Sequence, residues 1–102
     1  MKTIWKYELK ITDFQAIENM PEGAQILHVG AQTINRNTGD GSIIKWDKLM
    51  IWALVNPDNQ PCTRRFAVVG TDNPFPTEET QYIGTVQILG MVWHVFELMG
   101  GE

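Results

Sequence analysis

The sequence predicts a small all-β fold: an antiparallel meander, a sandwich or an open barrel of six to seven strands. Three observations support this prediction. Apolar and polar residues alternate in several short runs, turn-forming residues separate these runs, and no stretch of ten residues has a convincing helical period. An α+β variant with one short helical turn is the alternative. The chain length fits a single domain, so residues 1–102 are predicted to form one β-rich unit.

The N-terminal third is predicted to contain two strands. Large apolar residues occupy every second position of residues 5–11 and charged residues lie between them, which is typical of a strand with one wet face. Asp13 can cap a short helical turn over residues 14–17, and Pro21 prevents a longer helix. On the second strand, at residues 24–31, the side chains predicted to share one face are Leu27, Val29 and Ala31.

The middle of the chain contains its most polar segment. Residues 33–42 include Asn-Arg-Asn and Gly-Asp-Gly and have almost nothing to bury, which predicts the tip of a hairpin or a mobile loop. Strand character returns at residues 42–46. Residues 49–55 are apolar on both faces, so they are predicted to form a central strand that is covered on both sides. Further strands are predicted at residues 64–69, 82–89 and 91–98, with Gly90 at the bend of a closing hairpin.

Charge and hydropathy argue against several classes of protein. Eight Lys and Arg against twelve Asp and Glu give a net charge of −4, and an isoelectric point near 5.0 argues against general nucleic-acid binding. The longest apolar run has seven residues, against about 20 for a transmembrane helix. Charges at positions 6, 8 and 10 interrupt any signal peptide, and the lone Cys62 cannot form an intrachain disulfide. We therefore expect a cytoplasmic protein without membrane contact.

Residues that could support catalysis or metal binding are sparse. His28, His94 and Cys62 lack the close spacing of a zinc site and the local signature of a Cys hydrolase. The loop that begins at Asn35 lacks the glycine and the glutamate of an EF-hand at the required positions, and no phosphate-binding glycine motif occurs. An enzyme that uses His94 or His28 is therefore the weakest hypothesis. We expect no enzymatic activity, no cofactor and no metal.

Aromatic and basic side chains point to a binding surface instead. Trp46 follows the polar segment next to Lys45 and is expected to be partly exposed, and Trp and Arg are favoured at recognition hot spots. Arg64 and Arg65 begin a strand, and because adjacent strand residues point to opposite faces, at most one of them faces a given site. The candidate binding residues are Arg36, Lys45, Trp46 and either Arg64 or Arg65. Alternatively, these are ordinary surface residues, and the core tryptophans are Trp5, Trp52 and Trp93.

Six segments along the chain carry a further pattern: KTIWKY at residues 2–7, MPEGAQILHV at 20–29, IWALVNP at 51–57, GT at 70–71, YIGTVQ at 82–87 and HVFE at 94–97. Together they cover most of the chain and resemble a family of short phage and bacterial domains of unknown function. The resemblance implies a compact, β-rich cytoplasmic accessory protein, often encoded by a phage or prophage, and it transfers no catalytic residue. Family members pass almost directly from the second strand to the strand that begins at Ile51. Residues 33–50 are therefore predicted to be an inserted hairpin or loop.

Two functions are compatible with these observations. The first is a non-enzymatic, phage-type accessory binding protein, an anti-defence inhibitor that occludes a host protein with its loop and sheet edge and uses Trp46 as the anchor. The alternative is an oligomeric small-molecule binder that sequesters a nucleotide signal through arginines and stacked aromatic residues. Exposed strand edges must be paired, covered or charged, so we expect a homo-oligomer. The expected partner is a host or phage protein, or a small nucleotide.

Overall fold

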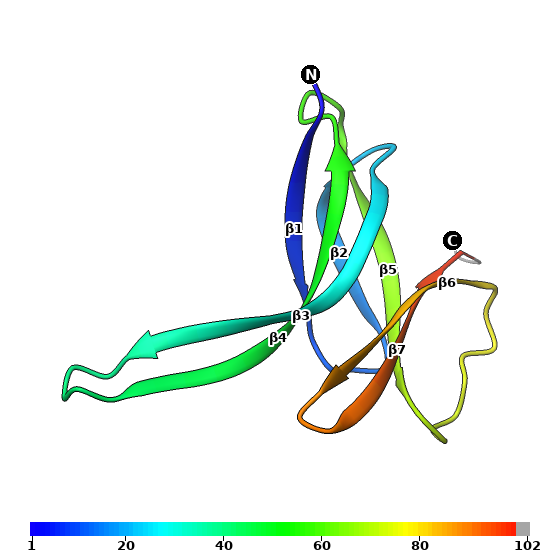
Figure 1. Ribbon diagram of the computed structural model, residues 1–102. Helices are drawn as coiled ribbons and strands as arrows, with labels where there is room; N and C mark the ends of the chain where they lie inside the picture. Colours follow the sequence, from blue (N-terminus) through cyan, green and yellow to red (C-terminus); the bar gives the residue numbers. More distant parts are fainter. Residues whose placement is uncertain (100–102) are drawn as a thin grey trace.

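All regular secondary structure in the computed structural model, which describes residues 1–99, is β-strand (Figure 1). In chain order the strands are β1 (Thr3–Leu9), β2 (Gln15–Pro21), β3 (Gln25–Asn37), β4 (Ile43–Val55), β5 (Pro61–Gly70), β6 (Thr80–Ile88) and β7 (Met91–Leu98). These seven strands confirm the all-β prediction. No helix in residues 1–99 could cross a membrane. Residues 100–102 of the predicted domain lie outside the described part of the chain.

The strands form two antiparallel sheets that pack face to face as a sandwich. β1, β4 and β3 make a three-stranded sheet in that order, so the strand predicted at residues 49–55 is central, as expected. Its full cover on both sides is wrong, because Leu49, Ile51, Ala53 and Val55 face the core whereas Trp52 and Leu54 on the other face are only half-buried. β2, β5, β7 and β6 make a four-stranded sheet, in which β6 and β7 form the predicted hairpin. The largest fully buried side chains come from both sheets: Leu9, Met20, Leu49, Ile51, Val55, Phe66, Val68 and Val95. Each contributes about 1.5–3 kcal/mol on leaving water, so this layer is the main source of stability.

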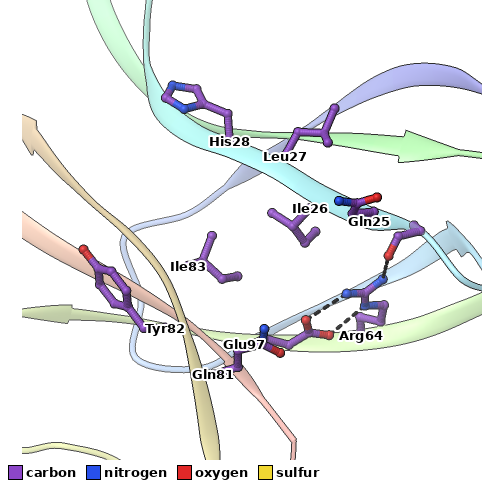
Figure 2. Close-up of a pocket in the computed structure, with 10 residues that line it drawn as sticks. Gln25, Ile26, Leu27, His28, Arg64, Gln81, Tyr82, Ile83 and Glu97 are labelled. Carbon is purple, nitrogen blue, oxygen red and sulfur yellow. Dashed lines mark hydrogen bonds and ion pairs between the residues drawn. The ribbon is translucent and has the colours of Figure 1, made fainter.

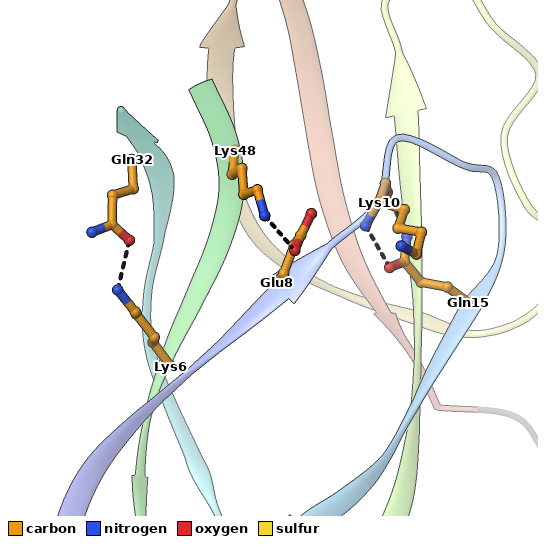
Figure 3. Close-up of polar contacts among 6 residues, drawn as sticks. All are labelled: Lys6, Glu8, Lys10, Gln15, Gln32 and Lys48. Atoms are coloured by element: carbon orange, nitrogen blue, oxygen red, sulfur yellow. Dashed lines mark hydrogen bonds and ion pairs between the residues drawn. The ribbon is translucent and has the colours of Figure 1, made fainter. Parts of the chain in front are cut away.

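The helical turn predicted over residues 14–17 is wrong. Gln15 already begins β2, and Ile17 lies opposite Arg64 of β5 with its side chain in the core. The Gln15 side chain also closes the preceding loop, because it accepts a hydrogen bond from the Lys10 N–H (2.8 Å) and donates one to the Lys10 carbonyl (2.6 Å) (Figure 3). These backbone groups are therefore satisfied without a helical turn.

A β-bulge changes which side chains of β3 face the core. The register of β3 with β4 shifts between Ile26 and His28, so Leu27 is the extra residue. Ile26 and Val29 pack on the core, whereas Leu27 is 46% exposed. The prediction that Leu27, Val29 and Ala31 share one face is therefore wrong for Leu27, because strict alternation does not continue through a bulge. Val29 and Ala31 do share a face, opposite Ile51 and Leu49.

β3 and β4 continue beyond the sandwich as a two-stranded ribbon (Figure 1). Toward the arm, the pairing of β4 with β1 stops at Leu49, which lies opposite Leu9. β3 and β4 stay paired further out, as far as Asn37 and Ile43. We call residues 32–48 the arm. The Cα radius of gyration of 15.3 Å exceeds the value of about 13 Å expected for a compact chain of this length, as a projecting arm requires.

Most of the polar segment is therefore strand, and the long loop expected over residues 33–42 shrinks to a tip. Residues 38–42 connect the two strands, and the hairpin itself is confirmed. Gly39 and Gly41 have φ angles of +90° and +92°, a region that side chains with a Cβ rarely adopt. The insertion predicted at residues 33–50 coincides with most of the arm and its root, and it stays a prediction.

Candidate functional site

The arm has one apolar face. Residues directly opposite each other in antiparallel strands point to the same side, and the register pairs Ile34 with Trp46 and Arg36 with Ile44. We call these four residues the apolar arm face. Ile44 is 52% exposed and Trp46 is 37% exposed, so both side chains lie against water rather than inside the core.

The opposite face of the arm is mostly polar. Thr33 pairs with Asp47, and its hydroxyl donates a hydrogen bond of 2.8 Å to the Asp47 carboxylate. Lys45 lies opposite Asn35 on the same side. Ile43 is the apolar exception and is 62% exposed. Because Ile43 and Ile44 are neighbours on one strand, they give a matched pair of identical side chains on opposite faces.

The tip of the arm is held by its own hydrogen bonds. The Asp40 carboxylate accepts hydrogen bonds from the Thr38 hydroxyl and from the Ser42 N–H, the latter at 3.0 Å. These hydrogen bonds, led by that from Thr38, hold the pKa of Asp40 below its ordinary value. The tip is ordered, but a two-stranded hairpin in water is marginally stable at best. The arm therefore gains stability from any surface that covers it.

Two polar contacts connect β1 to the root of the arm (Figure 3). The Lys6 ammonium donates to the Gln32 side-chain oxygen at 2.9 Å, and the Lys48 ammonium forms an ion pair with Glu8 at 3.2 Å. Gln32 and Lys48 lie opposite each other, on the same side as the apolar arm face. These contacts fix the root of the arm and place polar groups between the apolar arm face and the sandwich.

The two adjacent arginines of β5 point to opposite faces, as predicted. Arg64 donates to both carboxylate oxygens of Glu97, at 2.6 and 2.8 Å, and to the Ala24 carbonyl. The hydrogen bond to Glu97 raises the pKa of Arg64. Arg65 donates to Glu78 at 2.7 Å, and this hydrogen bond lowers the pKa of the Glu78 carboxyl. Both arginines are thus engaged by carboxylates of the sandwich.

The binding surface expected from the sequence is therefore assembled only in part. Arg36 and Trp46 share the apolar arm face, Lys45 points to the other side of the arm, and the β5 arginines belong to the sandwich. Sequence reasoning missed Ile34 and Ile44 as members of the surface. The alternation of apolar and charged residues at 44–47 was the available signal for Ile44, whereas Ile34 is the one apolar residue in 33–37 and the surrounding Asn and Gly residues favoured a loop.

A pocket of about 350 Å³ opens between β3 and β6 (Figure 2). It is lined by residues 24–28, by residues 81–83 and by the ion pair of Arg64 and Glu97. Figure 2 shows Ile26 and Ile83 pointing into it from the two strands. Because Glu97 balances the charge of Arg64, an anionic ligand would find little net attraction in this pocket.

A second hollow, of about 280 Å³, lies beside β4 where β1 ends. The end of β1 and the following loop contribute Glu8, Leu9, Lys10 and Ile11, β4 contributes Trp46, Asp47, Lys48 and Leu49, and β6 contributes Ile88. β1 stops pairing at Leu49 while β4 continues into the arm. The hollow therefore occupies the place into which a longer β1 would extend.

The titratable residues considered for catalysis are in ordinary surroundings. Both ring nitrogens of His94 lie within hydrogen-bond distance of threonine hydroxyls, at 3.0 Å from Thr71 and 3.2 Å from Thr85. His28 packs against the Trp52 ring with centroids 5.6 Å apart. Within residues 1–99, no three His, Cys, Asp or Glu side chains gather in a way that could hold a metal ion. The most distinctive surface is thus the arm.

Comparison with known proteins supports the expectation of a domain of unknown function. A search of curated proteins and a search of solved structures each returned no match. A family model described as a domain of unknown function, DUF7352, matches residues 1–102, the whole length of the chain. The chain therefore belongs to the DUF7352 family.

Proposed function

We propose that this chain is a non-enzymatic protein-binding module that docks on its partner through the apolar arm face. One observation carries the proposal: a ribbon of two strands projects from the sandwich with apolar side chains exposed along one side. Folding of the chain leaves Ile44 52% and Trp46 37% exposed, whereas Ile34 is half-buried. Burial of the area that stays exposed would contribute at most about 1.5–3 kcal/mol for each side chain.

The composition of the apolar arm face supports a protein partner. Trp and Arg are the residues most enriched at the energetic centres of protein interfaces, and Trp46 lies on this face with Arg36. The two isoleucines next to them provide the apolar surround that excludes water from such a centre. A narrow ribbon can also enter a cleft that a whole sandwich could not, so docking would occlude the partner's working surface.

The nature of the partner follows from the resemblance to phage and prophage domains. On that basis the chain acts in the cytoplasm of a bacterial host, and its partner is a host or phage protein. The favoured role is that of an anti-defence inhibitor, which blocks a host defence component by covering it. Such a role needs a binding surface and no catalytic group.

A capture experiment with matched variants tests this proposal. Tagged wild-type chain, Ile44→Ala, Trp46→Ala and the control Ile43→Ala are incubated with bacterial lysate, and recovered proteins are quantified by mass spectrometry. We expect one protein to be recovered equally by wild type and Ile43→Ala. Its recovery should fall at least roughly tenfold with Ile44→Ala or Trp46→Ala, since hot-spot truncations cost about 2 kcal/mol or more. Equal recovery by Ile43→Ala and Ile44→Ala baits would refute the assignment of the face.

The pocket between β3 and β6 supports a second candidate function, which is the binding of a small nucleotide by an oligomer. Its volume of about 350 Å³ falls within the range of small-molecule sites. The Arg64–Glu97 pair weighs against an anionic ligand there. Thermal denaturation with a panel of linear and cyclic nucleotides tests it, because saturation at a hundredfold excess over Kd stabilises a protein by about 2.7 kcal/mol. Absence of any shift would leave protein binding as the function.

A further inference from the structure

β1 ends early and leaves one edge of β4 unpaired. The last β1–β4 pair is Leu9 with Leu49, whereas β4 begins at Ile43. Residues 43–48 therefore have β3 on one side and no strand of the described chain on the other. The hollow of about 280 Å³ lies beside this edge. An edge and a hollow in this arrangement form an acceptor site for one more strand.

We propose that the strand at this site is β4 of a second copy of the chain, so that the arms of two copies join into one four-stranded antiparallel sheet. The proposal goes beyond partner binding and does not depend on it. A two-stranded ribbon is marginally stable in water, whereas a sheet of four strands exceeds the minimum of three needed for independent stability. A two-fold axis supplies both copies with the same contact.

Charge selects one register for this pairing. Opposed residues share a face, and an axis perpendicular to the sheet keeps each residue on its own face. The allowed registers therefore differ by steps of two residues. With Trp46 on the axis, opposite its own copy, Lys45 of each chain lies opposite Asp47 of the other. This pairing spans residues 44–48, because Leu49 is already paired with Leu9 on the same edge. Shifting the second copy by one step in one direction places Lys45 opposite Lys45, and shifting it in the other direction places Asp47 opposite Asp47. Both shifts are unfavourable, because like charges directly opposite each other are destabilising.

The same charges explain why this edge can pair although it is not apolar. Lysines on edge strands usually discourage pairing with other chains. Here Lys45 and Asp47 have opposite signs, so one register turns them into two symmetric ion pairs. Oδ1 of Asp47 accepts a hydrogen bond from the Thr33 hydroxyl, which leaves Oδ2 for an ion pair with Lys45 of the second copy. The free edge of β3 in the arm has Arg36 as its one charged side chain and therefore offers no comparable pair.

The accessible surface of the chain is larger than that of a compact monomer. It measures 6716 Å², whereas a folded monomer of this mass is expected to expose about 5,800 Å². The projecting arm accounts for this excess, since its strands expose both faces and their outer edges. In the paired arms both apolar arm faces lie on the same side, so a dimer would present a doubled docking surface around the two Trp46 side chains.

Cysteine cross-linking tests the register directly. Two chains are made in a Cys62→Ser background, one with Lys45→Cys and the other with Asp47→Cys. Opposed residues in an antiparallel pair have Cα atoms about 4.5–5.5 Å apart, within the range of about 4.4–6.8 Å that a disulfide needs. We expect a disulfide-linked dimer when the two chains are mixed, and little or none with either chain alone. Efficient cross-linking of a single Ile34→Cys chain, without the mixed product, would show pairing through β3 and overturn the proposal.

Charge exchange tests the same contact without new cysteines. Native mass spectrometry over a dilution series measures the dimer for wild type, Lys45→Asp, Asp47→Lys and the double exchange. We expect each single variant to weaken the dimer at least roughly tenfold, and the double exchange to restore it. A wild-type chain that stays monomeric up to its solubility limit, or a dimer that the single variants leave unchanged, would refute the proposal. Neither outcome affects the contrast between Ile43→Ala and Ile44→Ala in lysate capture, so the two proposals can fail separately.

Discussion

Arg64 and Glu97, which are 33 positions apart in the chain, form a two-pronged ion pair between β5 and β7, with N–O distances of 2.6 and 2.8 Å. The same guanidinium donates to the Ala24 carbonyl just before β3. The pair therefore ties the four-stranded sheet to the three-stranded sheet. The Glu97 carboxylate also neutralises the Arg64 charge, which a nucleotide site would have used to bind phosphate groups.

Glu97→Gln should destabilise the protein because it leaves the Arg64 charge without its counter-ion. Breaking a buried pair costs about 3–5 kcal/mol, and the Arg64 side chain is 20% exposed, so we expect a loss of about 2–4 kcal/mol in the free energy of unfolding. Urea denaturation measures it. Glu78→Gln, in the more exposed pair with Arg65, is the control and should change stability far less. Equal losses in the two variants would contradict the bridging role of Arg64.

Tyr7→Phe should make the protein more stable. The Tyr7 hydroxyl is buried and has no hydrogen-bond partner among the described residues, and replacing such a group by an apolar one of the same shape is expected to gain up to about 1 kcal/mol. Thermal unfolding of this variant and of Tyr82→Phe checks it. The Tyr82 hydroxyl lies 2.6 Å from the Thr85 hydroxyl, so its removal should bring no gain.

The same residue predicts a dependence on alkaline pH. Burial raises the pKa of Tyr7 above its ordinary value of 10.0, although the nearby Arg64 lowers it in part. The folded state therefore keeps the proton at a pH where the unfolded state has lost it. This contribution is complete below pH 10 and is lost as pH rises through the folded-state pKa. At pH 9 and above, the free energy of unfolding should fall less steeply with rising pH for Tyr7→Phe than for wild type. An equally steep fall in both proteins would contradict this assignment.

Gly84→Ala should strain the contact between β6 and β3. A Cβ at this position would come within 2.5 Å of the Val29 Cγ1 in the core, and overpacking of this kind costs about 1–3 kcal/mol. Val29→Ala should recover part of that loss in the double variant. Gly30→Ala is the matched control, because its Cβ would meet only the end of the exposed His28 ring. Additive losses for Gly84→Ala and Val29→Ala, measured by urea denaturation, would argue against direct contact.

Leu89→Asn should relieve strain at the β6–β7 turn. Leu89 has a φ of 54° and is followed by Gly90 at 79°, a pair of positive φ angles for which Asn-Gly is the preferred sequence. Leu89 is also 88% exposed, so its side chain contributes little packing. We expect a gain of roughly 1 kcal/mol. Leu89→Ala is the control and should show no such gain, since alanine does not favour positive φ. A thermal midpoint that is unchanged in both variants would mean that the turn is not strained.

The parts of the fold that could be predicted are those in which local alternation continues unbroken. β1, the central part of β4 and the β6–β7 hairpin follow the alternation and turn signals directly. β2 was missed because its register shifts between Ile17 and Met20, so these two buried apolar side chains do not follow strand alternation, and because polar Gln15 lies on the same face as Ile17. The faces of β3 were misassigned because the bulge at Leu27 has no reliable signal in the sequence.

The candidate site was predictable in its location but not in its composition. A polar segment next to a tryptophan marked the arm, and the adjacency of Arg64 and Arg65 correctly predicted that they face opposite ways. The partners of those arginines depend on register between distant strands, which local pattern does not report. The apolar arm face depends on the pairing of Ile34 with Trp46, and this pairing became visible only with the three-dimensional register.

The most direct test of partner docking compares two neighbouring isoleucines of β4. Binding of the partner recovered from lysate is measured for wild type, Ile43→Ala and Ile44→Ala, with thermal unfolding of each chain as the check on folding. The apolar arm face predicts wild-type affinity for Ile43→Ala and at least roughly tenfold weaker binding for Ile44→Ala, with similar unfolding temperatures. Equal affinities for the two variants, or a greater loss with Ile43→Ala, would contradict docking through this face.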